Sequence, residues 1–139
     1  MEIKIKKLHK DAVIPKYAKD GDAGLDLTAT RKWIEGSNIC YGTGIAMEIP
    51  KGYVGLVFPR SSIANKNLLL SNAVGVIDSG YRGEIMAKFK ATCGGSNTYE
   101  VGERICQIII VPYPTIEFNV VDELSETERG NGGYGSSDK

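Results

Sequence analysis

The chain has 139 residues, 42% hydrophobic and 24% charged, values typical of a single globular domain that buries its own core. Seventeen lysines and arginines balance seventeen aspartates and glutamates, so net charge favours neither nucleic acid nor an anionic membrane as a partner. No apolar run reaches the roughly 18 residues of a membrane span, and the start, MEIKIKKLHK, lacks a signal-peptide hydrophobic region. We therefore expect a cytoplasmic protein.

Alternation of apolar and polar residues predicts most of the secondary structure as strands. The pattern places them near residues 3–5, 45–49, 54–58, 85–90, 104–111 and 116–121. The turn signal PKG between the second and third predicts that these two strands form a hairpin. The stretch RICQIIIV, residues 104–111, is apolar on both faces and predicts a strand buried on both sides.

Helical spacing is almost absent, and one short helix around SSIANKN, after Pro59, is the most that the pattern supports. Seventeen glycines and closely spaced turns favour an all-β sandwich, jelly roll or barrel. The composition changes after Leu124, and we expect a β domain over residues 1–124 followed by a mobile C-terminal arm over residues 125–139.

The segment KDGDAGLDLTA, residues 19–29, carries aspartates that include Asp22 and Asp26. It is too sparse for a calcium loop, and solvated turn aspartates are the simplest interpretation. Gln107, inside the apolar strand, must find a hydrogen-bond partner if buried. Either a hydrogen bond within the core or a contact with a ligand would satisfy it.

FPRSSIA, residues 58–64, is a candidate anion site. Arg60 supplies charge, and Ser61 and Ser62 stand where a helix would begin and offer free N–H donors. A serine cap beside a surface arginine is the alternative.

The stretch SNAVGVIDSGYRGEIM, residues 71–86, combines a strand pattern with reactive side chains. Asn72 and Asp78 fall on the same face if the segment is extended. The apolar face ends in the carboxylate of Asp78, which is followed at once by a turn that contains Tyr81 and Arg82. A turn requires glycine but not these three side chains together, so the segment needs an explanation beyond turn formation.

GNGGYG, residues 130–135, lacks the flanking strand and helix of a dinucleotide fingerprint. Its glycines would still let the backbone approach phosphate oxygens, and Arg129 adds a cationic fork. Tyr134 could stack on a base, while Ser136 and Ser137 add hydroxyl donors. A frayed terminus is the alternative.

The cysteines and the single histidine limit the possible chemistry. Cys40, Cys93 and Cys106 lack the spacing of a zinc site or a disulfide framework, which favours a reducing compartment. His9 stands alone among lysines, so histidine triads and histidine-rich metal sites are excluded.

Five motifs occur in an order that resembles the trimeric deoxyuridine triphosphatase (dUTPase) family from about Ile3 to Ser137: DAGLDLTA, PRSSIA, NAVGVIDSGYRGEI, GERICQIII and RGNGGYGSS. The resemblance implies a distorted jelly roll, a homotrimer with active sites shared between subunits, and Mg²⁺-assisted hydrolysis of dUTP to dUMP and diphosphate. Such an activity would limit uracil incorporation into DNA and supply dUMP for dTMP synthesis.

The resemblance also assigns roles to individual residues. Asp78 matches the carboxylate that orients water toward the α-phosphorus. The nucleoside would contact a hairpin made of Asn72, Gly75, Val76, Ile77 and Tyr81, in which Tyr81 packs under the deoxyribose.

The other matched positions surround the phosphates and the metal. The side chains matched to phosphate contacts are Arg60, Ser61, Ser62 and Gln107, although glycine is frequent in the family at the position of Ser62. Asp26 matches a carboxylate that holds the water shell of Mg²⁺, and the substrate phosphates would supply most of the metal's ligands. Arg82 and Arg104 are interpreted as structural ion-pair or interface residues.

The resemblance identifies the arm as a lid that closes over a site built by other subunits; its contacting residues would be Arg129, Tyr134, Gly135, Ser136 and Ser137. Two alternatives to a dUTPase stay open. One is a relative of the dCTP deaminases, and the other is a non-catalytic nucleotide-binding regulator.

Overall fold

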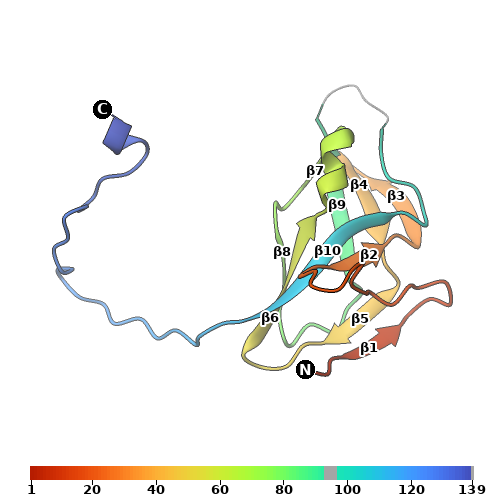
Figure 1. The fold of residues 1–139 in the computed structure, drawn as a ribbon, viewed down its shortest axis with the longest axis horizontal. Coiled ribbons are helices and arrows are strands. Elements are labelled where there is room, and N and C mark those ends of the chain that lie inside the picture. The colour runs from red at the N-terminus through yellow and green to blue at the C-terminus, as the bar shows by residue number, and fades with distance from the viewer. Residues whose placement is uncertain (93–96, 139) are drawn as a thin grey trace.

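The fold, seen here in a computed structural model that describes residues 1–92 and 97–138, consists of short strands and two 3-10 helices (Figure 1). The described residues contain no α-helix, and neither 3-10 helix has the length or apolar character needed to cross a membrane. In chain order the elements are β1 (Lys4–Lys7), β2 (Leu25–Thr28), β3 (Arg31–Glu35), β4 (Asn38–Gly42), β5 (Ile45–Glu48), β6 (Tyr53–Pro59), η1 (Ser61–Asn65), β7 (Leu68–Leu70), β8 (Gly75–Ile77), β9 (Met86–Ala91), β10 (Arg104–Pro112) and η2 (Ser136–Asp138).

Three antiparallel sheets make up the body of the molecule. Two have four strands, in the orders β2-β10-β6-β8 and β3-β4-β9-β7, and the third pairs β1 with β5. All three contribute to one hydrophobic core, which includes Leu27, Tyr41, Met47, Phe89 and Ile108. The all-β class predicted from the alternation pattern is confirmed, as is the jelly roll that the family resemblance implies.

Strand β10 runs through the centre of one four-stranded sheet, between β2 and β6. Its residues Ile105, Cys106 and Ile108 are fully buried, while its last third is partly exposed. The prediction of a buried strand is confirmed for the first part of the segment. This central position matters for the site because β10 brings β2 and the end of β6 together.

The predicted hairpin between residues 45–49 and 54–58 is wrong. The turn exists, since the N–H of Tyr53 donates to the carbonyl of Pro50 at 3.2 Å. However, β5 pairs with β1, whereas β6 pairs with β10 and β8. A turn signal fixes where the chain reverses, but pairing with distant strands decides which sheet each arm joins.

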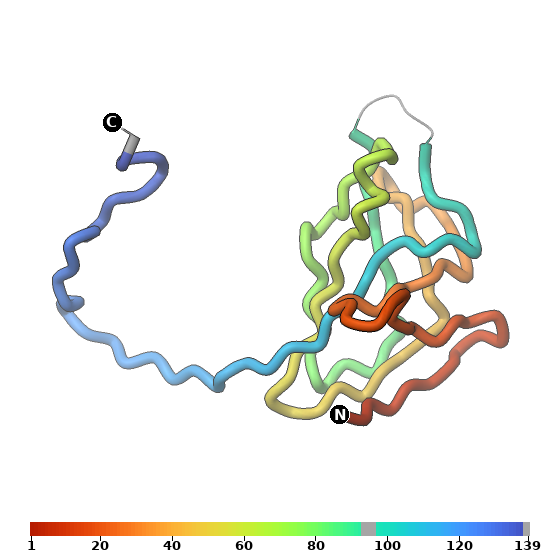
Figure 2. The backbone as a smooth tube through the Cα atoms, viewed as in Figure 1, coloured from red at the N-terminus to blue at the C-terminus, as the bar shows by residue number. Residues whose placement is uncertain are grey.

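The strand predicted at residues 116–121 does not form on this chain. Its apolar side chains point into solvent, with Ile116, Phe118 and Val120 exposed by 67%, 87% and 95%. After β10 the chain leaves the body as an extended arm, which is blue in Figures 1 and 2. Alternation of apolar and polar residues indicates that a segment is able to pair as a strand. Within the described residues, however, no strand of the same chain pairs with residues 116–121.

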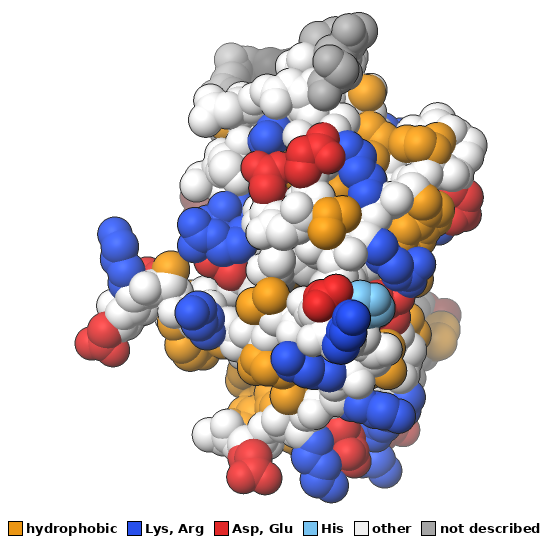
Figure 3. Space-filling model, turned by 90° about the vertical axis from the view of Figure 1, so that its right-hand side faces the viewer, with side chains coloured by type: hydrophobic (Ala, Val, Ile, Leu, Met, Phe, Trp, Pro, Cys, Tyr) orange, Lys and Arg blue, Asp and Glu red, His pale blue; other side chains and the backbone are white. Residues whose placement is uncertain are grey.

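The structure also contains elements that the sequence pattern did not predict: β2, β3, β4 and β7. The predicted short helix is present as the 3-10 helix η1. Cys40 and Cys106 are buried and free, and Cys93 lies outside the described residues. On the face shown in Figure 3, positive and negative side chains are interspersed, in keeping with the balanced charge.

Candidate functional site

Four of the predicted site residues line one polar pocket of about 300 Å³, which we call the phosphate-side pocket. They are Asp26, Arg60, Ser61 and Gln107. The sheet explains their meeting, because Gln107 in β10 stands opposite Asp26 of β2 on one side and opposite Phe58 of β6 on the other. Residues far apart in the sequence therefore converge where β6 ends.

Asp26 anchors two arginines at this pocket. Its Oδ1 accepts from Nε of Arg60 at 2.8 Å and its Oδ2 from Nη1 of Arg104 at 3.1 Å. The Asp26 side chain is only 15% exposed, so both ion pairs are partly shielded from water. The interpretation of residues 19–29 as a turn with solvated aspartates is therefore wrong for Asp26, which lies in β2.

Gln107 uses its amide to hold the end of β6. Its Nε2 donates to the carbonyl of Pro59 at 3.0 Å, next to Arg60. A Cβ on Gly24 would lie 2.1 Å from Gln107 Oε1, so only glycine leaves room for this amide. Gln107 thus satisfies its hydrogen-bonding need within the protein and still lines the pocket.

The two serines of η1 face different surroundings. Ser61 is exposed and lines the phosphate-side pocket. Ser62 turns inward, and its Oγ lies 3.0 Å from the hydroxyl of Tyr99. Arg60, not a serine, occupies the N-cap position of η1, and it makes no side-chain capping hydrogen bond.

The backbone is strained where the predicted nucleoside hairpin begins. Ala73 has a φ of +60°, and the N–H of Val74 donates to the carbonyl of Asn72 at 2.6 Å, which closes a tight turn. Positive φ is uncommon for a residue with a Cβ, and such strain persists where the surrounding structure enforces it, often at functional sites. Strand β8 follows at once.

Asp78 stands directly after β8 on an exposed turn that is well braced. The N–H of Tyr81 donates to the carbonyl of Asp78 at 3.0 Å, and the Tyr81 hydroxyl donates to the carbonyl of Glu84 at 2.9 Å. The Tyr81 ring lies against Gly83, where a Cβ would come within 2.4 Å of the hydroxyl oxygen.

Arg82 stabilises the same turn. Its Nη1 donates to the carbonyl of Ser79 at 2.7 Å, and its Nη2 lies 3.6 Å from Glu48 of β5. The interpretation of Arg82 as a structural ion-pair residue fits this contact, as it fits the pairing of Arg104 with Asp26.

The glycine-rich arm folds onto itself. Arg129 Nε donates to the carbonyl of Gly132 at 3.0 Å, and the N–H of Ser136 donates to the carbonyl of Gly133 at 3.0 Å. Arg129, Tyr134, Gly135, Ser136 and Ser137 surround a hollow within the arm. Tyr134 has a φ of +52° and is fully exposed, so its ring is available to a partner.

Within one chain these groups form three separate clusters. Ile77, the residue before Asp78, pairs with Gly55 near the start of β6, whereas Arg60 follows the far end of that strand. Five residues of extended chain separate the two positions, or roughly 17 Å at 3.3 Å per residue. The arm forms the third cluster and extends away from the body (Figure 2).

The side chains that the structure describes do not form a metal site of their own. Within the described residues, no three His, Cys, Asp or Glu side chains lie close enough together to hold an ion. Asp26 directs both carboxylate oxygens at arginines, which leaves it suited to contact a metal through water but not to bind one directly. A Mg²⁺ ion would need its ligands from elsewhere.

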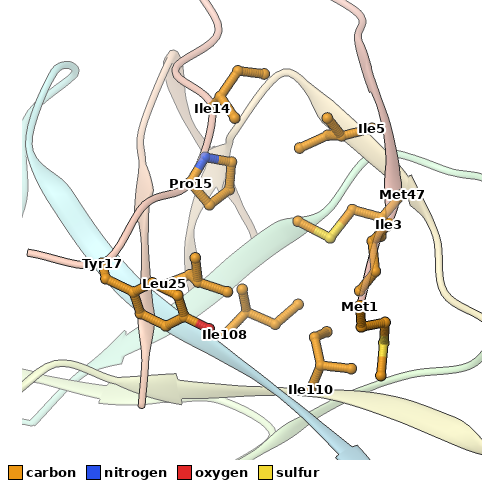
Figure 4. A pocket seen from close by; sticks show the side chains of 10 residues that line it. All are labelled: Met1, Ile3, Ile5, Ile14, Pro15, Tyr17, Leu25, Met47, Ile108 and Ile110. Atoms are coloured by element: carbon orange, nitrogen blue, oxygen red, sulfur yellow. The ribbon is translucent and has the colours of Figure 1, made fainter. Parts of the chain in front are cut away.

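A separate apolar pocket of about 410 Å³ lies between the β1–β5 sheet and the sheet that contains β2 and β10. Figure 4 shows its lining: Met1, Ile3, Ile5, Ile14, Pro15, Tyr17, Leu25, Met47, Ile108 and Ile110. It contains none of the predicted site residues.

Comparison with known proteins identifies the family. A sequence model of the dUTPase family matches residues 10–138. The chain belongs to the dUTPase family. It is 43% identical to the deoxyuridine 5'-triphosphate nucleotidohydrolase of Escherichia phage T5 over 97% of both chains. It is 42% identical to the enzyme of the same name from Nautilia profundicola over 100% of both chains.

Solved dUTPase structures share the fold. The dUTPase of Staphylococcus bacteriophage 80alpha with dUPNHPP superposes with a TM-score of 0.85, at 30% identity over 98% of both chains. A variant dUTPase from phage phi11 of S. aureus, described for its coordination of a structural Mg(II) ion, superposes with a TM-score of 0.75 at 26% identity. This second match covers 88% of the present chain and 98% of the other.

Two residues that contact the candidate site residues are not predicted from the sequence. Glu84 lies within the motif NAVGVIDSGYRGEI, which indicates no role for it. Its carbonyl accepts a hydrogen bond from the Tyr81 hydroxyl, and its carboxylate accepts one from the N–H of Gly44 at 2.8 Å. Tyr99 carries no local signal, because its contact with Ser62 arises from packing between segments 37 residues apart. Only the assembled core reveals it.

Proposed function

We propose that this dUTPase family member hydrolyses dUTP to dUMP and diphosphate in the cytoplasm, and so limits uracil incorporation into DNA and supplies dUMP for dTMP synthesis. The observation that carries the proposal is the exposed carboxylate of Asp78, held on a braced turn directly after β8. Relatives at 42–43% identity across nearly the whole chain are named for this reaction.

In the proposed mechanism Asp78 accepts a hydrogen bond from a water molecule and aims its oxygen at the α-phosphorus. The water oxygen forms a bond to phosphorus, the bond to the bridging oxygen breaks, and diphosphate leaves. Asp78 takes up or relays the proton that water loses. Positioning and general-base assistance together account for rate factors of at least about 10²–10⁴.

Strand β8 suits recognition of a base by its backbone. It is the last strand of its sheet, so one row of its N–H and C=O groups has no neighbouring strand within the described chain. Gly75, Val76 and Ile77 would present these groups to uracil, with the Asn72 amide alongside. A rigid hairpin rejects cytosine because mismatched donors and acceptors would be left buried and unpaired.

Tyr81 would close the sugar side of this subsite. Its hydroxyl is already bonded to Glu84, which fixes the ring over Gly83. A ring held in this way can pack against a deoxyribose and leave no room for a 2′-hydroxyl. Discrimination against UTP therefore depends on steric exclusion and not on a lost hydrogen bond.

We further propose that the complete site forms between copies of the chain in a homotrimer. Asp78 and Arg60 lie too far apart in one chain to act on the same phosphate group, so a neighbouring copy would supply the phosphate-side pocket with Arg60, Ser61 and Gln107, and with Ser62 beside it. The exposed apolar alternation of residues 116–121 supports assembly, because a second copy could cover it.

The arm, residues 125–139, would act as the mobile lid on the rest of the protein, residues 1–124. Tyr134 would stack on uracil, and Arg129 would contact the terminal phosphate, with Gly135, Ser136 and Ser137 adding backbone and hydroxyl donors. Closure would exclude water other than the nucleophile.

Mg²⁺ would arrive bound to the triphosphate, because the described residues offer no direct ligand cluster. When bound, the ion neutralises phosphate charge. Asp26 would contact its water shell while continuing to hold Arg60 and Arg104 in place.

The test is to incubate the protein and Mg²⁺ with dUTP, dCTP, dTTP and UTP separately, and to identify the products. We expect dUMP and diphosphate from dUTP alone. Ammonia release from dCTP would instead support a deaminase-type relative. Tight dUTP binding without turnover would support a nucleotide-binding regulator.

A further inference from the structure

Tyr99 is a fully buried residue whose hydroxyl reaches the phosphate side of the site from within the core. It is 1% exposed, and its Oη lies 3.0 Å from Oγ of Ser62 in η1. A phenol buried this deeply must pair its hydroxyl, because an unsatisfied polar group away from water is costly. Ser62 is the partner that the structure provides.

The Tyr99 ring is itself held rigidly. The hydroxyl of Tyr41 donates to the Tyr99 carbonyl at 2.8 Å. The ring packs against Tyr41 and Phe89, with centroid distances of 6.3 Å and 5.8 Å, and Lys66 Nζ lies 4.9 Å from its centroid. Contacts on several sides therefore fix the position of its hydroxyl, and with it that of Ser62.

Ser62 passes this constraint on to Arg60. Arg60 Nη1 lies 3.5 Å from Ser62 Oγ, while Arg60 Nε donates to Asp26 at 2.8 Å. Two edges of the guanidinium are thereby held by the protein. The remaining N–H groups can face the pocket in a fixed orientation, which suits the planar, two-point recognition of phosphate.

We infer that Tyr99 is a positioning residue for phosphate recognition, acting through Ser62 to orient the guanidinium of Arg60. This inference rests on the proposed function and adds to it a residue that touches no part of the nucleotide. In this inference the Ser62 side chain holds Arg60 in position and does not need to contact phosphate itself. Burial raises the pKa of Tyr99, so the phenol stays protonated beside Ser62.

The test compares Tyr99→Phe with Tyr41→Phe. Each change removes one buried hydroxyl from the same aromatic cluster and keeps the ring, but only Tyr99 contacts Ser62. The readout is calorimetric binding of a non-hydrolysable imido analogue of dUTP with Mg²⁺, beside the melting temperature. We expect both variants to lose similar stability. Tyr99→Phe removes the contact with Ser62 and should bind the analogue about tenfold more weakly, whereas Tyr41→Phe loosens the Tyr99 backbone but keeps that contact and should weaken binding much less.

Repeating the Tyr99→Phe change in two altered backgrounds shows whether Tyr99 acts through Arg60. In Arg60→Ala the tenfold loss should disappear, whereas in Asn72→Ala, which alters the base side, it should persist. Equal binding by the two Tyr→Phe variants, or a loss that persists without Arg60, would overturn the inference. Absence of dUTP turnover by the unmodified protein is a different result and would overturn the proposed function instead.

Discussion

Asp78 and Arg60 lie toward opposite ends of the β6–β8 strand pair, because Asp78 follows the residue paired with Gly55 near the start of β6, whereas Arg60 follows the last residue of β6. If they act on one substrate, they come from different copies of the chain. Asp78→Asn and Arg60→Ala should each be inactive alone. When the two variant proteins are unfolded together in equal amounts and refolded as mixed trimers, activity should return at about a quarter of the sites. At those sites the chain that supplies Asp78 and the chain that supplies Arg60 both carry the unmodified residue.

The control for this complementation is Asp78→Asn refolded with a chain that carries both substitutions. That mixture has no source of intact Asp78 and should stay inactive. If the mixture of Asp78→Asn with Arg60→Ala were as inactive as this control, although light scattering showed that trimers had formed, each site would lie within a single chain.

Asp78→Asn should bind the imido analogue of dUTP with nearly unchanged affinity and lose at least about 10²-fold in kcat. The amide has the shape of the carboxylate but lacks the charge that orients and deprotonates water. Stopped assays of diphosphate release check kcat, and calorimetry checks binding. Turnover within a few fold of the unmodified protein would remove Asp78 from the mechanism.

Tyr81→Ala should weaken discrimination between dUTP and UTP by about tenfold or more, since the ring would no longer occupy the space of a 2′-hydroxyl. Tyr81→Phe is the matched control because it keeps the ring and loses only the 2.9 Å hydrogen bond to Glu84. We expect this control to retain most of the discrimination. The ratio of kcat/KM for the two nucleotides is the measurement, and an unchanged ratio in Tyr81→Ala would refute the role.

Deleting residues 129–139 should change the free energy of unfolding by less than about 0.5 kcal/mol. The hydrogen bonds described for this segment are internal to the arm, so the core loses nothing. Activity should fall by about 10²-fold or more, because the lid that excludes water is gone. Urea unfolding and steady-state kinetics test the two halves of the prediction, and full activity would contradict the lid.

Stability should fall as the pH rises above about 9, because burial raises the pKa of Cys106 from 9.0 to about 12. Its thiol stays protonated in the folded chain while it ionises in the unfolded chain. The contribution of the protonated Cys106 thiol to the free energy of unfolding is therefore complete below pH 9 and decreases by about 1 kcal/mol between pH 9 and 10. Burial also raises the pKa of Tyr41 and Tyr99, which extends the loss above pH 10.

Urea unfolding at pH 8, 9 and 10 measures this slope. The free energy of unfolding of Cys106→Ala, measured at the same pH values, should decrease less between pH 9 and 10 than that of the unmodified protein. Identical slopes in the two proteins would show that the thiol does not titrate in this way.

The sequence predicted the fold class because strand alternation is a local property, and it located strands β1, β5, β6, β8, β9 and β10. It could not predict strand partners. The PKG turn indicated a hairpin, yet β5 and β6 joined different sheets once distant strands competed for their edges. Residues 116–121 show the same limit, because an alternating pattern does not say whether its partner lies on the same chain.

The candidate site was predicted residue by residue only through the family resemblance. Local chemistry favoured the simpler interpretation for Asp26, whose arginine partners are 34 and 78 residues away in the sequence. For Ser62 the resemblance predicts a phosphate contact, which stays a prediction, and nothing near it in the sequence indicates its contact with Tyr99. Contacts of this kind depend on the assembled core.

The carboxylate of Asp26 between Arg60 and Arg104 has a consequence for the end of the reaction. Two unopposed guanidinium groups would hold a multiply charged leaving group tightly, whereas one shared negative charge lowers the local excess from two to one. If the pocket holds the phosphates as proposed, this lower charge would let diphosphate depart between turnovers. The acid that orders the arginines would then also limit product inhibition.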